Sequence, residues 1–169
     1  MFYRRLFRGI LAVLLIAVLP LLAQAQDMAN QPAARNLKDI KLTNFPGLPT
    51  CTVGAVVSGD PSKGPSVIVA KLAAGCVIPW HWHTGNEQLM FVSGTARYEA
   101  KDGKPATVTA GGFVQNPGHH AHQLRCTSAC ALYVNSDAPF DIHYVDAQGK
   151  ELTPDAALKA VGEKAPKMP

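Results

Sequence analysis

The sequence predicts an all-β fold, an antiparallel sandwich or barrel with one short helix at its C-terminal end. From residue 46 to about 145 it is a succession of short runs rich in β-branched and aromatic residues, and turn residues separate them at roughly 8–12-residue intervals. No convincing amphipathic helix interrupts these runs. About 144 residues follow position 25, which is one ordinary domain with enough chain to bury a core.

Residues 1–25 have the pattern of an export signal. A basic start is followed by an apolar run from Ile10 to Leu22 and by a small-residue cleavage site that ends at Ala25. The run is shorter than the ~20 residues of a bilayer-spanning helix, so we expect cleavage near Ala25 and a periplasmic or secreted protein. The alternative is an uncleaved anchor. An arginine pair at positions 4–5 partly resembles a twin-arginine signal, but the strongly hydrophobic run favours the general secretory (Sec) route.

The charge balance points away from nucleic acid and membrane surfaces. The chain has 16 basic and 12 acidic residues, and the leader holds three arginines and no acid, which leaves 13 basic residues against 12 acidic. Nucleic-acid binding needs a clustered excess of Lys and Arg, and disorder needs few apolar residues with a high net charge. We therefore expect a neutral folded domain that binds neither nucleic acid nor, after signal cleavage, a membrane.

The remaining chain divides into three parts. Residues 26–45 are polar and predict a flexible lead-in, which can form a short helix or an edge strand. Residues 46–149 form the β domain, whose expected strands are TCTVGAVVS, SVIVAKL, VIPWHWH, EQLMFVSG, TARYEA, ATVTA, FVQN, HQLRC, ALYVN and FDIHYVD. Residues 150–169 form a helix and tail, since Thr153 can cap a helix that starts at Pro154 and stops at Gly162.

Four cysteines, at positions 51, 76, 126 and 130, would meet an oxidising compartment after export. Cys126 and Cys130 flank a three-residue turn between two expected strands, where paired residues lie about 5.5 Å apart and can form a disulfide. A Cys51–Cys76 bridge is the other expected pair, although spacing alone does not fix the connectivity. The alternative is four buried thiols.

Five of the six histidines lie in two short segments. In the strand around Trp80–His83, alternation sends His81 and His83 to one face and the tryptophans to the other. Glu87 follows a turn and opens the next strand, which returns an oxygen ligand towards the same interior. Three more histidines, at positions 119, 120 and 122, begin a later strand. Imidazoles and a carboxylate gathered in this way are typical ligands of a transition metal.

The first of these segments resembles the first cupin motif, G-x5-H-x-H-x3-E-x6-G, from Gly75 to Gly94 at every fixed position. The second motif, G-x5-P-x-G-x2-H-x3-N, is matched by Gly111, Pro117 and His122, whereas its second Gly is His119 and its Asn is Cys126. The flanking stretches GDPSKGPSVIVAKL and APFDIHYVD are also similar to one branch of small single-domain bacterial cupins. The resemblance covers roughly residues 46–150.

This resemblance implies a double-stranded β-helix, the jelly-roll barrel of the RmlC-like cupins, with one divalent metal inside. Its implied ligands are His81, His83, Glu87 and His122. Three imidazoles and one carboxylate leave open positions on an octahedral ion for water, O2 or substrate, and they suit Fe, Mn, Co, Ni, Cu or Zn alike. A cupin that binds no metal is the alternative.

Two other histidines are candidates for proton transfer. His119 and His120 would lie near the mouth of the pocket, where an imidazole can move protons near neutral pH, and the alternative for each is a solvated turn residue or a further metal ligand. The departure at His119 also questions whether the tight turn of the family is kept. His143 is expected to be structural.

The walls of the pocket follow from strand alternation. Leu89 and Phe91 should face inward with Glu87, and Leu124 and Cys126 should face inward with His122, so the pocket is expected to be apolar. Arg97 is the nearest cation in sequence that could anchor a carboxylate, but a solvent-facing position is favoured for it. Trp80 and Trp82 are expected between sheets or at a homodimer interface.

Together these features favour a metal-dependent enzyme, most simply an oxidoreductase of the dioxygenase type that acts on a small organic molecule. Because cupins also include isomerases, lyases and decarboxylases, this reaction class comes from the family and not from the residues. The alternative is a non-enzymatic module that binds a metal or small ligand for sensing or storage.

Overall fold

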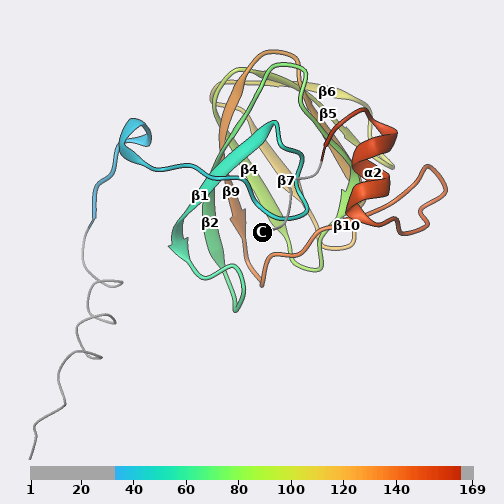
Figure 1. The fold of residues 1–169 in the computed structure, drawn as a ribbon, viewed down its shortest axis with the longest axis horizontal. Coiled ribbons are helices and arrows are strands. Elements are labelled where there is room, and N and C mark those ends of the chain that lie inside the picture. The colour runs from blue at the N-terminus through green and yellow to red at the C-terminus, as the bar shows by residue number, and fades with distance from the viewer. Residues whose placement is uncertain (1–32, 165–169) are drawn as a thin grey trace, which may run out of the picture. The chain divides into compact units, whose positions relative to one another are not determined.

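Two five-stranded antiparallel sheets enclose a common core in the computed structural model, which describes residues 33–164 (Figure 1). One sheet has the order β1-β2-β9-β4-β7, with bounds Thr52–Gly59, Ser66–Leu72, Cys130–Ser136, Glu87–Ser93 and Phe113–Asn116. The other has the order β10-β3-β8-β5-β6, with bounds His143–Tyr144, Val77–Trp82, His122–Cys126, Thr95–Ala100 and Ala106–Thr109. The predicted all-β jelly-roll fold is confirmed. The export signal predicted over residues 1–25 lies outside the described residues.

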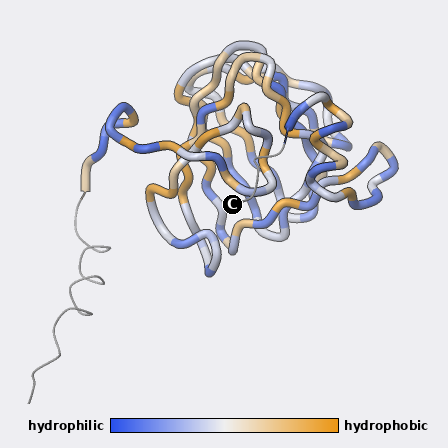
Figure 2. Tube along the Cα trace, in the orientation of Figure 1, coloured by the Kyte–Doolittle hydropathy of each residue, from blue (hydrophilic) through white to orange (hydrophobic). Residues whose placement is uncertain are grey.

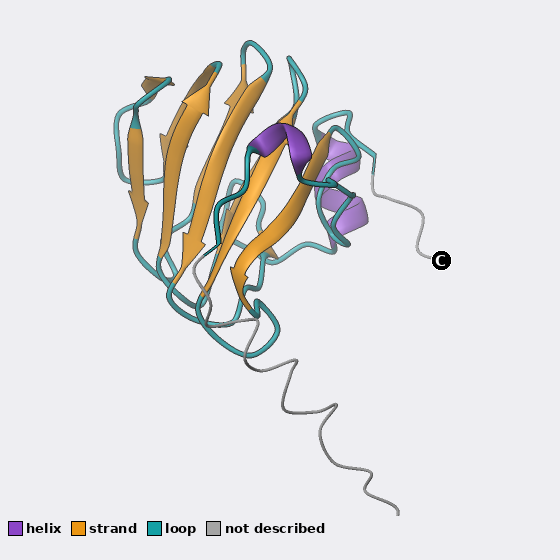
Figure 3. Ribbon diagram, turned by 90° about the vertical axis from the view of Figure 1, so that its left-hand side faces the viewer, coloured by secondary structure: helices purple, strands orange, loops and turns teal. Residues whose placement is uncertain are grey.

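Strand alternation builds the core. Every second residue is buried along β8 and along β4 as far as Phe91, and the inward side chains Leu89, Phe91, Leu124 and Cys126 are all in the core cluster, as the sequence predicts. Hydrophobic residues lie mainly along the strands, whereas the loop of residues 146–151 is hydrophilic (Figure 2). Figure 3 shows neighbouring strands side by side in one sheet. The core therefore lies between the sheets, and alternation decides which side chains enter it.

Strand β10 is much shorter than the predicted run of residues 140–146. The backbone before it bonds elsewhere, because the carbonyl of Asp141 accepts from His83 Nδ1 and its carboxylate accepts from the Thr84 amide at 2.8 Å. Residues 140–142 consequently form a loop against the turn that follows β3, and only His143 and Tyr144 pair with that strand.

The chain enters and leaves the barrel through short helical turns. A 3₁₀ helix, η1, spans Leu37–Asp39 within the predicted lead-in, and Thr43 then pairs with Gly54. Helix α2 spans Pro154–Ala160; the Thr153 side chain caps it by accepting from the Ala156 amide, as expected from the sequence. Its inner face packs against β3. No helix in the described part of the chain is both long and apolar enough to span a bilayer.

Two disulfides join the four cysteines. Cys51–Cys76 links the residues before β1 and β3, which belong to different sheets, and Cys126–Cys130 closes the turn between β8 and β9. The sequence left this connectivity open. A bridge across 25 residues stabilises a domain by about 3 kcal/mol, mainly by restricting the unfolded chain.

Candidate metal centre

Three strand ends bring the four predicted ligands together inside the barrel. His81 lies near the end of β3 and pairs directly with His122, the first residue of β8. His83 follows β3, and Glu87 opens β4 after the turn of residues 84–86. All four side chains are buried, with 2–6% of each residue exposed. Strand alternation turns them inward, which is the arrangement that the sequence predicts.

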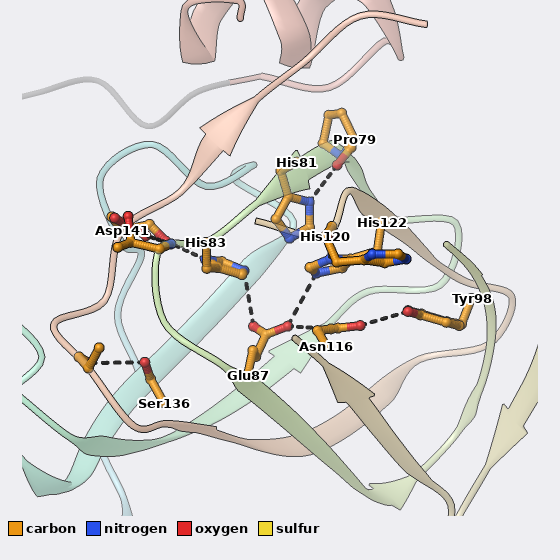
Figure 4. Close-up of polar contacts among 12 residues, drawn as sticks. Pro79, His81, His83, Glu87, Tyr98, Asn116, His120, His122, Ser136 and Asp141 are labelled. Atoms are coloured by element: carbon orange, nitrogen blue, oxygen red, sulfur yellow. Dashed lines mark hydrogen bonds and ion pairs between the residues drawn. The ribbon is translucent and has the colours of Figure 1, made fainter. Parts of the chain in front are cut away.

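The side chains converge on one point, as Figure 4 shows. One ligand atom from each of the four lies within 4.8 Å of the corresponding atoms of the others. Glu87 Oε1 lies 3.3 Å from His83 Nε2, and Glu87 Oε2 lies 3.3 Å from His122 Nε2. Donors that bind one ion at about 2.1 Å lie about 3 to 4 Å from each other, so the cluster needs little change to hold an ion.

Backbone carbonyls fix the orientation of all three imidazoles. The Nδ1 atoms of His81, His83 and His122 contact the carbonyl oxygens of Pro79, Asp141 and His120, respectively. A carbonyl oxygen can only accept, so each Nδ1 carries the proton and donates it. Each neutral ring therefore presents the lone pair of Nε2 to the centre, which is the usual arrangement of a histidine that binds a metal.

Two of the imidazole nitrogens at this centre lack a donor. The Nε2 atoms of His83 and His122 are buried without a hydrogen-bond partner, although each faces a Glu87 oxygen. A lone pair and a carboxylate oxygen at 3.3 Å repel each other unless a proton or a cation lies between them. Three imidazole acceptors and one carboxylate thus fit a divalent transition metal.

The electrostatics of the metal-free cluster keep His81 neutral and favour a positive charge beside Glu87. Burial, and then the nearby imidazoles of His122 and His83, hold the pKa of His81 well below its usual value. Burial opposes the charge of Glu87, but its histidine neighbours outweigh burial and hold the pKa of this carboxyl well below its usual value. Burial also opposes the charge of His83, yet Glu87 outweighs it and raises the pKa of His83. A proton on His83 can thus take the place of a cation.

Asn116 and Tyr98 form a polar chain behind Glu87 that the sequence did not reveal. Asn116 Nδ2 donates to Glu87 Oε2 at 2.7 Å, and Asn116 Oδ1 accepts from the Tyr98 hydroxyl at 2.6 Å. Asn116 is only 1% exposed and pairs with Glu87 across β7 and β4. The sequence offered one signal for its burial: Asn116 lies two residues after the buried Val114 in the strand FVQN, so its side chain points to the same side. Asn116 fixes the carboxylate in one orientation.

Neither of the two predicted proton carriers lines the cavity formed by the described residues. His119 is exposed, and its ring lies 4.7 Å from that of Trp82, whose side chain alternates with the inward His81 and so lies outside the barrel. His120 contributes its backbone carbonyl to His122. The four-residue cluster contains neither imidazole. Proton transfer by His119 or His120 stays a prediction that this arrangement does not support.

The turn of the second motif is kept although His119 replaces glycine. His119 adopts a φ of 60°, which is uncommon for a residue with a side chain, and its amide donates to the carbonyl of His83 at 2.8 Å. Gly118 supplies the close approach, since a Cβ there would lie 2.5 Å from the Thr84 carbonyl oxygen. The turn therefore still holds the start of β8 against the end of β3.

The remaining candidates lie outside the site. The ring of His143 stacks on Trp82 at 3.9 Å and contacts the carboxylates of Asp141 and Glu151, which agrees with its expected structural role. The side chain of Arg97 is 53% exposed and pairs with Glu99, as expected for a solvent-facing residue. Neither side chain reaches the four converging ligands.

A cavity of about 670 Å³, part of it open to solvent, extends from the ligand cluster. Its walls combine inward strand residues such as Leu89 and Leu124 with Phe45, Leu48, Phe140 and Ile142 from two loops. Phe45 belongs to the segment predicted as a lead-in. Its participation depends on the pairing of Thr43 with Gly54, which local sequence does not reveal.

Comparisons with known proteins agree with this architecture. Residues 68–135 match the family model of the cupin domain. The polyketide cyclase RemF from Streptomyces resistomycificus is similar in structure, with a TM-score of 0.58 at 16% identity over 69% of this chain and 87% of that one. An RmlC-like cupin from Shewanella frigidimarina gives 0.54 at 16% identity over 64% and 92% of the two chains. KdgF from Halomonas sp. gives 0.51 at 17% identity over 62% and 92%. At these identities the likeness shows the fold alone. No curated protein sequence matches significantly.

Proposed function

Because this chain belongs to the cupin family, we propose that it is a metal-dependent enzyme, of the oxidoreductase type, that acts on a small organic molecule. One observation carries the proposal. Three imidazoles and one carboxylate converge on a point at the edge of a largely apolar cavity, and the Nε2 atoms of His83 and His122 are buried there without a hydrogen-bond partner. One divalent cation would satisfy all four side chains at once, and its remaining coordination positions would face the cavity.

His81, His83, Glu87 and His122 would hold the ion. A bound transition metal would supply Lewis acidity and, if it is redox-active, electron transfer with O2. The carbonyl of Asp141 keeps His83 in the tautomer that binds metal, and Asn116 keeps the Glu87 carboxylate turned towards the centre. The apolar walls exclude water from the reacting groups and strengthen the interactions of any charge that develops beside them.

The fold alone does not determine which class of reaction the protein catalyses. RemF, a polyketide cyclase by name, has the same fold, so the fold does not by itself select oxidation. In the described part of the chain, the four ligands are the only titratable side chains that line the cavity. That observation favours a second candidate, a non-enzymatic binding module, because no separate acid or base is present to move a proton.

Metal analysis combined with O2 uptake tests the proposal. Protein purified from its native compartment should carry one transition-metal ion per chain, and a panel of small acids, phenols and sugars should contain a compound that stimulates O2 uptake. The His81→Ala variant should lose both properties, and His143→Ala should keep both. Less than about 0.2 ion per chain would contradict any metal-dependent role. A full complement of metal without turnover of any panel member would favour the binding module.

We also propose that the protein is exported to the periplasm or secreted. The leader pattern of residues 1–25 and the two disulfides support this, since disulfides persist in oxidising compartments. N-terminal sequencing of the mature protein should begin just after Ala25. A full-length chain in the cytoplasm with free thiols would contradict export.

A further inference from the structure

The cavity beside the ligand cluster is lined mainly by apolar side chains, and its polar side chains are almost all the four ligands. Of the seventeen residues that line it, twelve are apolar, four are the converging ligands, and the last is Thr52. Among the residues described, no lysine, arginine or aspartate lines it. Polar contacts are therefore concentrated at one end of the space, and any ligand meets hydrocarbon everywhere else.

Thr52 provides no free hydrogen-bond donor. It is 3% exposed, and its hydroxyl lies 3.5 Å from Cys76 Sγ. Because Cys76 is bonded to Cys51, its sulfur carries no proton, and the Thr52 hydroxyl is the donor in this contact. A ligand hydroxyl placed along the walls would consequently lose its water and find no partner except the oxygen of this one nearly buried side chain.

Two loops extend the apolar surface beyond the strands. Phe45 and Leu48 come from the segment before β1, and Phe140 and Ile142 come from the segment before β10. All four are half-buried, and the ring of Phe140 lies 5.0 Å from that of His83. A molecule that reaches the ligand cluster is thus surrounded by aliphatic and aromatic side chains over its length.

The charge of the centre limits the polar end of the ligand. Glu87 is the one acidic side chain in the lining of the described cavity, and the neutral imidazoles add no charge. A divalent ion with one carboxylate leaves a single positive charge, which one monoanionic donor group neutralises. A second anionic group would be buried in the apolar part of the cavity without a counter-ion, and that is costly.

We propose that this cavity takes molecules with one anionic oxygen donor at one end and an apolar body, and that it rejects dianions and polyols. The inference rests on the proposed function only for the metal that anchors the donor group. It names the substrate class, a monoanion such as an acid, enolate or phenolate with a hydrocarbon skeleton, and it excludes sugar acids.

Three six-carbon probes test the inference directly. Hexanoate carries one carboxylate and an apolar chain, adipate adds a second carboxylate, and gluconate adds hydroxyl groups. Calorimetric titration of each into the metal-loaded protein should show that hexanoate binds at least about a hundredfold more tightly than gluconate and adipate, since a single misplaced polar group already costs about that factor. Equal affinities, or no binding of hexanoate, would overturn the inference.

A positive charge introduced into the cavity lining should change the relative affinities of these probes. The Ile142→Lys variant adds a cation at a half-buried position, where the flexible stem can keep its ammonium near solvent, and should raise the ratio of adipate to hexanoate affinity at least tenfold. Val92→Lys, on the outward face of β4, is the matched control and should leave the ratio unchanged. An unchanged ratio in both variants would contradict the inference.

The same titrations separate the two proposals. Metal content is measured on each sample first. If the protein holds no metal, the proposed function fails; if it holds metal but does not discriminate among the probes, only the substrate class fails.

Discussion

Histidines inside the barrel and on its outer face differ in what their two ring nitrogens contact. The inner histidines, His81, His83 and His122, give Nδ1–H to backbone carbonyls and point Nε2 at one another and at a buried carboxylate. Of the outer histidines, His143 stacks on Trp82 and contacts exposed or half-exposed carboxylates, and the ring of His119 lies tilted by 35° against the same Trp82. The same side chain is therefore a candidate ligand on one face of β3 and a packing element on the other.

The contrast shows that burial and fixed tautomers, and not the number of histidines, define the site. On the outer face, water and exposed carboxylates can satisfy either ring nitrogen, so contacts there contribute little, about 0 to 1 kcal/mol. In the interior, an unsatisfied acceptor has no such alternative. The inner cluster should depend on a cation, whereas the outer stack should not.

Removing a histidine inside the barrel should weaken metal binding far more than removing one on its outer face. His122→Ala should lower metal affinity by more than about a hundredfold, since it removes a ligand whose supporting contacts alone are worth 10- to 100-fold. His143→Ala and His120→Ala should retain the metal. Metal content by mass spectrometry, with circular dichroism to confirm the β fold, measures this. Full occupancy in His122→Ala, or loss in His120→Ala, would mean that another histidine is the ligand.

A smaller effect is expected one contact away from the ligands. Asn116→Leu removes the amide that donates to Glu87 Oε2 at similar volume, and should weaken metal binding about 10- to 100-fold. Asn135→Leu is a matched control, because Asn135 donates to Gln88 across neighbouring strands, away from the ligands. Competition with a coloured chelator gives both affinities. Equal affinities in the two variants would show that Asn116 does not position the carboxylate.

The smallest effect concerns the stability of the metal-free protein. The folded pKa of Glu87 is lowered, so its contribution is present above the unfolded pKa of about 4.3 and is lost as pH falls through the folded pKa. The folded pKa of His83 is raised, so its contribution is present below about 6.5 and is lost as pH rises through the folded pKa. Glu87→Gln should therefore destabilise the metal-free fold most between about pH 4.3 and 6.5.

Urea unfolding of the metal-free proteins at several pH values measures this difference. We expect a loss of about 1–3 kcal/mol in that window, the usual cost of leaving a buried polar group without its partner. Glu99→Gln, which removes a surface partner of Arg97, should cost less at every pH. A pH-independent loss in Glu87→Gln would contradict the proposed proton on His83.

Local pattern was enough to predict the strands and the converging ligands. Strand alternation and the turn before Glu87 act over a few residues, so the inward faces of β3, β4 and β8 could be derived from the sequence. The first cupin motif gave the spacing between the two histidines and the glutamate of the ligand set. Helix α2 was equally local, since Thr153, Pro154 and Gly162 define its ends.

The supporting contacts could not be predicted, because they depend on distant pairing. Asn116 meets Glu87 only through the register of β7 with β4, 29 residues apart. The Asp141 carbonyl meets His83 across 58 residues, and this contact also explains why β10 is short. Phe45 enters the cavity because Thr43 pairs with Gly54. None of these contacts has a local sequence signature.

A structure of the metal-loaded protein, with the ion identified by its X-ray absorption edge, would show which side chains hold the metal. We expect one ion per chain bound by the Nε2 atoms of His81, His83 and His122 and by an oxygen of Glu87, with open positions that face the apolar cavity. An ion bound through Nδ1 of these rings, an ion held by His119 or His120, or a loaded protein whose four side chains bind nothing would contradict it.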